Sequence, residues 1–127
     1  MNTAARFTAE FPCSAGGARR ARRRLAGFAK EWLHGDDLSG FELASGEALA
    51  NCVEHAGGPT LVVVCWCDRG RLTAEIWHQG RGFVPPAAVS APPAGAPRGY
   101  GLFIMHELLD AIEFIDGGRG LRLVKEI

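Results

Sequence analysis

One stretch of the chain carries polar side chains at the spacing at which a helix would present them together. Asn51, Glu54 and His55 lie four, seven and eight residues after Glu47, so a helix places all four on one side. Their neighbours would form a separate, apolar side made of Ala48, Leu49, Cys52, Val53 and Ala56. A polar row beside an apolar one is either a solvated helix surface or a functional site, and these residues alone leave both alternatives open.

Two clusters of glycines have the composition of a phosphate-binding site. The first is Gly80-Arg81-Gly82-Phe83, and the second, Arg98-Gly99-Tyr100-Gly101, stands immediately before an expected helix. A helix N-terminus offers unpaired backbone N–H groups and the positive end of the helix dipole, and glycine lets the backbone approach an anion closely. Neither cluster has the ending of a P-loop or the context of a dinucleotide fingerprint. Glycines that serve only in turns are the alternative.

The hydrophobic pattern predicts the elements that would position these residues. Their order is βααββαββ, with the helices on one face of a mixed or antiparallel sheet. His78 ends an alternating apolar row on one strand and should therefore face the core. The segment 84–97, rich in Pro and Ala, has the length typical of lids and binding loops. The expected strands are 7–11, 60–67, 71–78, 111–115 and 121–126. Three helices are expected: the first begins after Ser14, its predicted N-cap, and the other two cover 38–55 and 102–111.

Size and composition indicate one cytoplasmic domain that spans residues 1–127. The chain has 47% hydrophobic and 22% charged residues, which excludes disordered, collagen-like and coiled-coil proteins. Its longest mostly apolar run, 60–67, is too short to span a bilayer, and the N-terminus lacks the apolar core of a signal peptide. We therefore expect no membrane association.

The charges balance overall, with fourteen basic and fourteen acidic residues, but they are unevenly distributed. Residues 1–35 contain seven basic and two acidic residues, and five arginines fall between Arg19 and Arg24 on the outward side of the first expected helix. A solvated helix face and a docking surface for an acidic partner both explain this cluster. Direct nucleic-acid binding is not expected, because aromatic residues are not interleaved with the arginines.

Taken together, the polar helix and the glycine clusters resemble a known superfamily. The segment Glu47-Ala-Leu-Ala-Asn51-Cys-Val-Glu-His55 is similar to its N-box, Gly80-Arg-Gly82-Phe83 to its first glycine box and Gly99-Tyr-Gly101-Leu102 to its second. The superfamily is that of the GHKL (histidine kinase-like) ATPases, and the similarity is greatest to anti-sigma-factor serine/threonine kinases. It covers residues 7–127 and implies a Bergerat-type ATP-binding fold. This is a two-layer α/β sandwich whose mixed, mostly antiparallel sheet is covered on one face by three helices.

The resemblance implies a role for the residues of each motif. Asn51 would bind Mg²⁺, for which an amide oxygen is a suitable hard ligand. Glu47 would be the general base that deprotonates a nucleophilic hydroxyl. The segment 84–97 would be the lid over the nucleotide. The residues expected to bind ATP are Asn51, His78, Gly80, Gly82, Gly99, Tyr100, Gly101 and Leu102.

His78 departs from the family pattern. The family has at this position an aspartate that accepts a hydrogen bond from the adenine amino group. A neutral imidazole has one acceptor nitrogen and could receive the same proton, whereas a doubly protonated ring only donates. The sequence therefore leaves open whether ATP is bound.

Three functions are compatible with these residues. The first is a protein kinase that sequesters a sigma factor and phosphorylates an anti-anti-sigma antagonist in a partner-switching pathway. The second is a partner-binding module without effective ATP binding, and the third is an ATPase or kinase-like domain that serves another partner. The resemblance also implies a homodimer, and a monomer remains the alternative.

Overall fold

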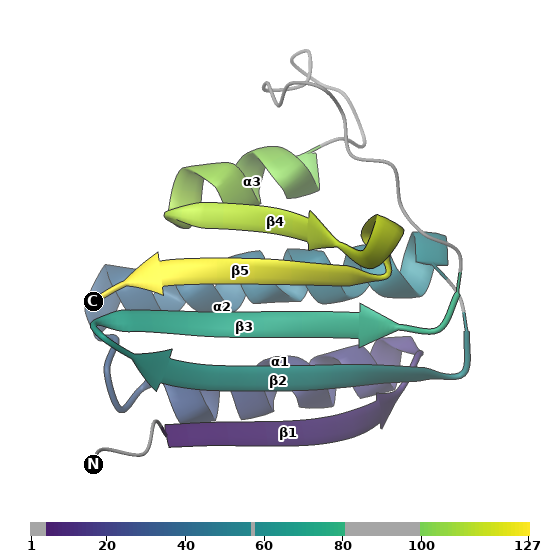
Figure 1. The fold of residues 1–127 in the computed structure, drawn as a ribbon, viewed down its shortest axis with the longest axis horizontal. Helices are drawn as coiled ribbons and strands as arrows, with labels where there is room; N and C mark the ends of the chain where they lie inside the picture. Colours follow the sequence, from purple (N-terminus) through teal and green to yellow (C-terminus); the bar gives the residue numbers. More distant parts are fainter. Residues whose placement is uncertain (1–4, 57, 81–99) are drawn as a thin grey trace.

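The computed structural model describes residues 5–56, 58–80 and 100–127, and its elements follow the predicted order (Figure 1). None of the described helices is long and apolar enough to cross a membrane. The strands are β1 (Ala5–Pro12), β2 (Thr60–Asp68), β3 (Arg71–His78), β4 (Ala111–Ile115) and β5 (Gly120–Glu126). The helices are α1 (Ala15–Ala29), α2 (Gly35–Asn51) and α3 (Tyr100–Leu108), with a π-helical turn η1 (Cys52–Ala56) and a 3₁₀ turn η2 (Asp116–Gly118).

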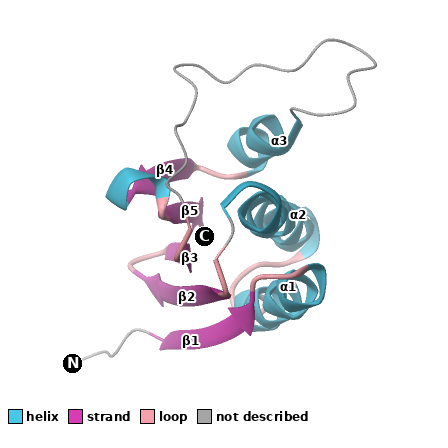
Figure 2. Ribbon diagram, turned by 90° about the vertical axis from the view of Figure 1, so that its right-hand side faces the viewer, coloured by secondary structure: helices cyan, strands magenta, loops and turns pink. Residues whose placement is uncertain are grey.

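The strands form one sheet in the order β1-β2-β3-β5-β4, and all four pairings are antiparallel. The predicted two-layer α/β fold is confirmed. The sequence allowed either a mixed or an antiparallel sheet, and the described strands form an antiparallel one. Figure 2 shows α1, α2 and α3 on the same face of the sheet. The apolar row of β3 that ends at His78 is buried, as the alternation predicted.

Helix α1 begins where the sequence predicted, because Ser14 caps it. The Ser14 Oγ accepts a hydrogen bond from the Gly17 N–H at 3.1 Å. Gly17, Ala21, Leu25 and Ala29 recur at every fourth position and are buried. At Gly17 the helix comes so close to β1 that a Cβ would lie 1.8 Å from the Pro12 carbonyl oxygen. A residue without a side chain is therefore required at this contact.

Helix α2 differs at both ends from the single helix 38–55 that the sequence predicted. It begins at Gly35, before the expected start, and Asp36 and Asp37 occupy its first turn. Carboxylates are favourable there because they face the positive end of the helix dipole. After Asn51 the hydrogen bonding changes to the π-helical turn η1, so the predicted polar row ends at Asn51. Glu54 and His55 follow on η1, where both are exposed, and the Nε2 of His55 lies 3.8 Å from the Oε2 of Glu54.

Helix α3 begins and ends earlier than predicted. Its last residue is Leu108, and Ala111, expected to end the helix, is the first residue of β4. The Asp110 N–H donates a hydrogen bond to the Val124 carbonyl of β5 at 2.9 Å. This bond to a neighbouring strand ends the helix, and periodicity along the chain does not reveal it.

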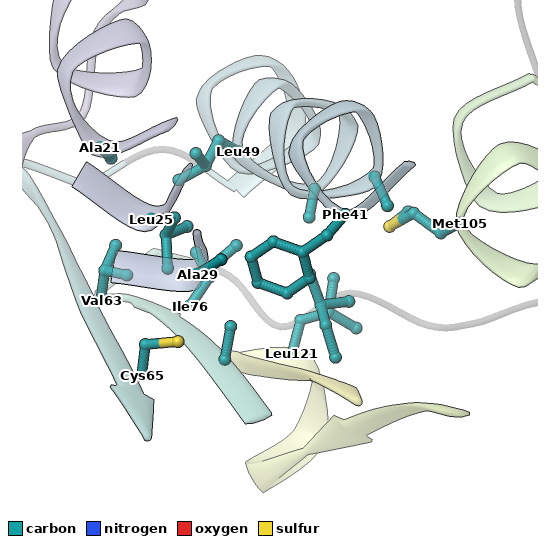
Figure 3. Packing of buried hydrophobic residues seen from close by; sticks show 14 of the residues in the cluster. Ala21, Leu25, Ala29, Phe41, Leu49, Val63, Cys65, Ile76, Met105 and Leu121 are labelled. Carbon is teal, nitrogen blue, oxygen red and sulfur yellow. The ribbon is translucent and has the colours of Figure 1, made fainter. Parts of the chain in front are cut away.

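Phe41 of α2 lies in the middle of the hydrophobic core (Figure 3). Its side chain is fully buried, together with Leu25 from α1, Ile76 from β3 and Met105 from α3. A single cluster thus joins the three helices to the sheet. Burial of this apolar surface holds the ends of α2 and β3 in a fixed relation to each other.

Candidate functional site

The end of α2, the end of β3 and the turn η2 meet at one end of the sheet, to the right in Figure 1. A pocket at this end is lined by residues of all three, among them Asn51, Cys52, His78 and Gly118, and by Phe114 and Leu121 from β4 and β5. Its volume of about 30 Å³ accommodates a group the size of a water molecule or an amino group. The structure therefore brings together two residues that the sequence singled out separately, Asn51 and His78.

His78 is buried in this pocket, with 7% of its surface exposed, and uses one of its two ring nitrogens. Its Nε2 lies 3.0 Å from the Gly118 carbonyl oxygen. Because a carbonyl oxygen only accepts, Nε2 must carry a proton, and the neutral ring then has its acceptor at Nδ1. Nδ1 is buried and has no hydrogen-bond partner among the described residues. An unpaired buried acceptor costs about 1–3 kcal/mol, so Nδ1 favours a ligand that brings a donor.

An unusual backbone turn places the Gly118 carbonyl against His78. The angle φ is positive at three successive residues, 51° at Asp116, 66° at Gly117 and 88° at Gly118. Glycine adopts this region without steric cost, which explains the two glycines. The His78 backbone N–H also donates to the Arg119 carbonyl at 3.0 Å. The turn thus holds both the backbone and the ring of His78.

Gly118 lines the pocket but was not among the site residues predicted from the sequence. Its segment, Asp116-Gly-Gly-Arg-Gly120, signalled only a turn between two strands. The contact joins residues 40 positions apart in the chain, and it depends on the pairing of β3 with β5. No spacing within the sequence encodes such a contact.

Glu47 lies apart from this pocket. It is half-buried in a groove of about 410 Å³ between α1 and α2, where Arg19 and Arg22 are also on the lining. Asn51, one helical turn later, is half-buried in the pocket with His78. The two residues therefore serve neighbouring surfaces. The apolar residues of the groove are Ala15, Ala18, Leu43, Ala50 and Val53.

The glycine motifs are described in part. Gly80 is half-buried immediately after β3, whereas Gly82, Gly99 and the expected lid 84–97 lie outside the described residues. The first turn of α3 consists of Tyr100, Gly101 and Leu102. The second glycine cluster therefore stands at a helix N-terminus, as expected. This end of α3 lies at the same end of the molecule as the C-terminus of β3 (Figure 1).

The walls of the pocket are apolar. Burial, with a smaller contribution from nearby Cys13, raises the pKa of Cys52 to about 12. The Cys52 thiol is therefore neutral and unreactive near neutral pH, and it adds to the apolar lining supplied by Phe114 and Leu121. Apolar walls with a few placed polar groups are typical of sites that bind small molecules.

The polar groups of this region fit ATP and Mg²⁺ in chemical type. Asn51 offers an amide oxygen for the ion, Nδ1 of His78 offers an acceptor, and the first turn of α3 offers backbone N–H groups for phosphate. Within residues 5–56, 58–80 and 100–127, no group of three His, Cys, Asp or Glu side chains could hold a metal by itself.

Comparison with known proteins identifies the family. A model of the histidine kinase-like ATPase domain matches residues 11–126. Among solved structures, the chain is similar to the crystal structure of the RsbU and RsbW domains of Rv1364c from Mycobacterium tuberculosis, with 18% sequence identity and a TM-score of 0.65. That match covers 95% of this chain and 31% of the other, so the two share a fold. No curated protein matches the chain. With nearly its whole length matched, the chain belongs to the histidine kinase-like ATPase domain family.

Proposed function

We propose that the protein is an anti-sigma regulatory factor that uses ATP and Mg²⁺ to phosphorylate a serine or threonine of an anti-anti-sigma antagonist. One observation carries the proposal: Asn51 and His78, two residues that the sequence singled out separately, line the same pocket. They do so in a chain of the histidine kinase-like ATPase family. The likeness to a structure that contains an RsbW domain supports the anti-sigma branch of that family.

In this proposal, Asn51 acts from the pocket and Glu47 acts from the groove between α1 and α2. Asn51 would hold Mg²⁺ through its amide oxygen, and bound ATP would supply the phosphoryl group. Glu47, one helical turn before Asn51, would accept the proton of the antagonist's hydroxyl while that oxygen attacks the terminal phosphorus of ATP and ADP leaves. The antagonist would approach along the groove between α1 and α2 that Glu47 lines. The groove reaches the molecular surface, where Leu43 on its lining is 47% exposed, so a side chain of another protein can enter it.

The arginines of α1 support a role in binding protein partners. Arg19, Arg20, Arg22, Arg23 and Arg24 are all exposed. Within the described part of the chain, none of them forms an ion pair. Their charge is therefore available to an acidic surface on the sigma factor or on the antagonist.

A second candidate function is favoured by His78, which stands where the resemblance places an adenine-binding aspartate. A neutral imidazole is a weaker hydrogen-bond acceptor than a carboxylate. A chain that binds ATP too weakly for phosphate transfer would still bind the same partners. Calorimetric titration of the protein with Mg-ATP separates the two functions: measurable binding supports the kinase, and its absence, with partner binding retained, supports the binding module.

Two substitutions test the roles proposed for Asn51 in the pocket and Glu47 in the groove. Asn51→Ala should abolish phosphate transfer from labelled ATP to the antagonist, because it removes the side-chain ligand of Mg²⁺. Glu47→Gln should slow transfer by about 10²-fold or more through loss of the base, with Mg-ATP affinity unchanged because Glu47 lies outside the pocket. His55→Ala is the matched control, since His55 is exposed at the same end of the molecule. Full transfer by Asn51→Ala would contradict the assignment.

A further inference from the structure

We propose that Cys13 and Cys52 form a disulfide when a peroxide oxidises the protein, and that this bond is a redox switch beside the pocket. The two residues are 39 positions apart in the chain, and they belong to different elements. The proposed function uses neither thiol, so formation of the bond is tested independently of it. The effect of the bond on phosphate transfer rests on the proposed function.

The fold brings the two cysteines into contact. The end of β1 and the turn η1 lie at the same end of the molecule, to the right in Figure 1. Cys13 immediately follows β1, and Cys52 is the first residue of η1. The Cys13 thiol donates a hydrogen bond to the Cys52 carbonyl oxygen, with a separation of 3.9 Å from Sγ to oxygen. Cys13 also contributes to the raised pKa of Cys52, so the two sulfur atoms lie within electrostatic reach of each other.

Both cysteines are held where they meet, but neither lies within a regular element. The Cys13 N–H donates to the Pro59 carbonyl at 3.0 Å, which keeps Cys13 beside the chain that connects η1 to β2. Cys52 begins a π-helical turn outside the regular hydrogen-bond pattern of α2. A small shift of this turn toward Cys13 therefore leaves α2 itself intact.

The difference in burial between the two thiols sets the order of the reaction. Cys13 is half-buried and Cys52 is buried, so Cys13 meets the peroxide first. Its sulfur takes one oxygen from hydrogen peroxide and becomes a sulfenic acid, and the other oxygen leaves as water. The Cys52 sulfur then attacks the Cys13 sulfur, and the sulfenic oxygen leaves as water with the Cys52 proton. In total, two thiols and one hydrogen peroxide give one disulfide and two waters.

The other two cysteines provide an internal comparison. Cys65 and Cys67 face the same side of β2, two residues apart. An extended strand separates such Cα atoms by about 6.6 Å, close to the upper limit of about 6.8 Å for a disulfide. Pairing of β2 with both β1 and β3 fixes this separation. We therefore expect no disulfide between Cys65 and Cys67.

The bond would change the surroundings of Asn51. Cys52 is the next residue in the chain, and both residues line the pocket. Movement of Cys52 toward Cys13 would draw a pocket wall toward the β1–α1 connection and displace the end of α2. A misplacement of about 1 Å in a reactive site costs about 10²-fold in rate. Oxidation should therefore slow phosphate transfer by about that factor, and reduction should restore it.

Treatment of the full chain with hydrogen peroxide, followed by mass spectrometry of a non-reduced digest, tests the bond itself. A pair of peptides linked through Cys13 and Cys52 should appear, and dithiothreitol should separate them. A thiol titration should fall from four thiols per chain to two. A digest without this link, or with links only between separate chains, would overturn the proposal.

Two substitutions keep the assignment specific. Cys13→Ser should lose the linked peptides and retain its remaining thiols. Cys67→Ser is the matched control, because Cys67 is also half-buried, and it should form the link as wild type does. Loss of the link in Cys67→Ser as well as in Cys13→Ser would contradict the pairing.

NMR of the Asn51 side-chain amide reports on the switch without any nucleotide. Its resonances should shift when the wild-type protein is oxidised, and they should stay in place when Cys13→Ser is treated in the same way. Unchanged resonances in a wild-type protein that carries the disulfide would overturn its role as a switch.

The outcomes separate the failure of this inference from the failure of the proposed function. If the disulfide forms and shifts the Asn51 amide, but Mg-ATP binds in neither state, the proposed function fails and the switch stands. If reduced and oxidised proteins transfer phosphate at the same rate, the switch is overturned and the proposed function stands.

Discussion

For a single residue, the neighbours of each polar atom decide what it can do. His78 shares an apolar strand face with Leu72, Ala74 and Ile76, which by itself describes a core residue. The Gly118 carbonyl changes that description, because it occupies Nε2 and leaves Nδ1 as a buried acceptor. The chemistry of the site therefore depends on a backbone atom of another element.

Replacing His78 by the aspartate of the family should have two opposite effects. His78→Asp should tighten ATP binding by roughly 5- to 150-fold, because a charged acceptor forms a stronger hydrogen bond than a neutral one. It should also lower the free energy of unfolding by about 1–2 kcal/mol, because a carboxylate cannot donate to the Gly118 carbonyl. Calorimetry and urea unfolding measure the two effects. Lower stability without tighter binding would show that the neutral acceptor does not limit affinity.

At the scale of a secondary-structure element, helix α1 shows that packing contacts can decide whether a helix forms even where helix propensity is low. Helix α1 contains Gly16, Gly17 and Gly27, which all weaken an isolated helix. It forms because its buried residues pack on the sheet and because Gly17 lets it approach Pro12. The same helix carries the arginines, and they occupy different environments: Arg19 and Arg22 line the groove, and Arg24 lies 5.4 Å from the ring centre of Phe7.

Two glycines of α1 should respond to alanine in opposite ways. Gly17→Ala should destabilise the protein by about 3 kcal/mol, because its Cβ would lie 1.8 Å from the Pro12 carbonyl oxygen and the helix would have to shift. Gly27→Ala is the matched control, since no atom lies within 4 Å of its Cβ. It should stabilise the protein by about 0.5–1 kcal/mol through helix propensity. Urea unfolding of both variants checks the pair, and equal effects would contradict the packing argument.

The outer arginines of α1 should affect association rather than stability. Arg20 and Arg23 are exposed and do not line the groove. The double change to Glu should slow binding of an acidic partner, most strongly at low ionic strength, because it reverses an attractive field. Stopped-flow association rates measure the effect, with Arg69→Glu, in the turn between β2 and β3, as a charge-changing control. Equal rates for the double variant and wild type would leave the cluster as a solvated helix face.

At the scale of the whole molecule, folding buries two cysteine thiols and thereby changes their pKa values. Cys52 and Cys65 are both buried, in η1 and in β2, and burial raises the pKa of each to about 12. Neither lies in a disulfide. Their protonated thiols are therefore part of the folded state, and they link its stability to pH.

Stability should fall on the alkaline side because the unfolded chain releases these two protons first. The contribution is fully present below pH 9.0, the ordinary thiol pKa, and is lost as the pH rises toward about 12. Its size is on the order of 4 kcal/mol for each thiol. Urea unfolding across this range measures the slope, and Cys52→Ala with Cys65→Ala should flatten it. An unchanged slope in the double variant would contradict the link.

Several features of the protein follow from the sequence alone. The element order, the Ser14 cap and the burial of the row ending at His78 depend on neighbours a few residues away, and local periodicity encodes such contacts. The resemblance to the histidine kinase-like ATPase family was visible for the same reason, because each of the segments that carry it is short and continuous.

Only the tertiary structure decided the features that depend on contacts between distant segments. Helix α3 ends early because Asp110 bonds to β5, and Glu47 and Asn51, neighbours on α2, line different depressions because different elements face each of them. Nδ1 of His78 is a buried acceptor because Gly118 of η2 lies against Nε2. Each outcome requires packing across the sheet, where residues far apart in the chain supply the partner atom, and no spacing along the sequence specifies that partner.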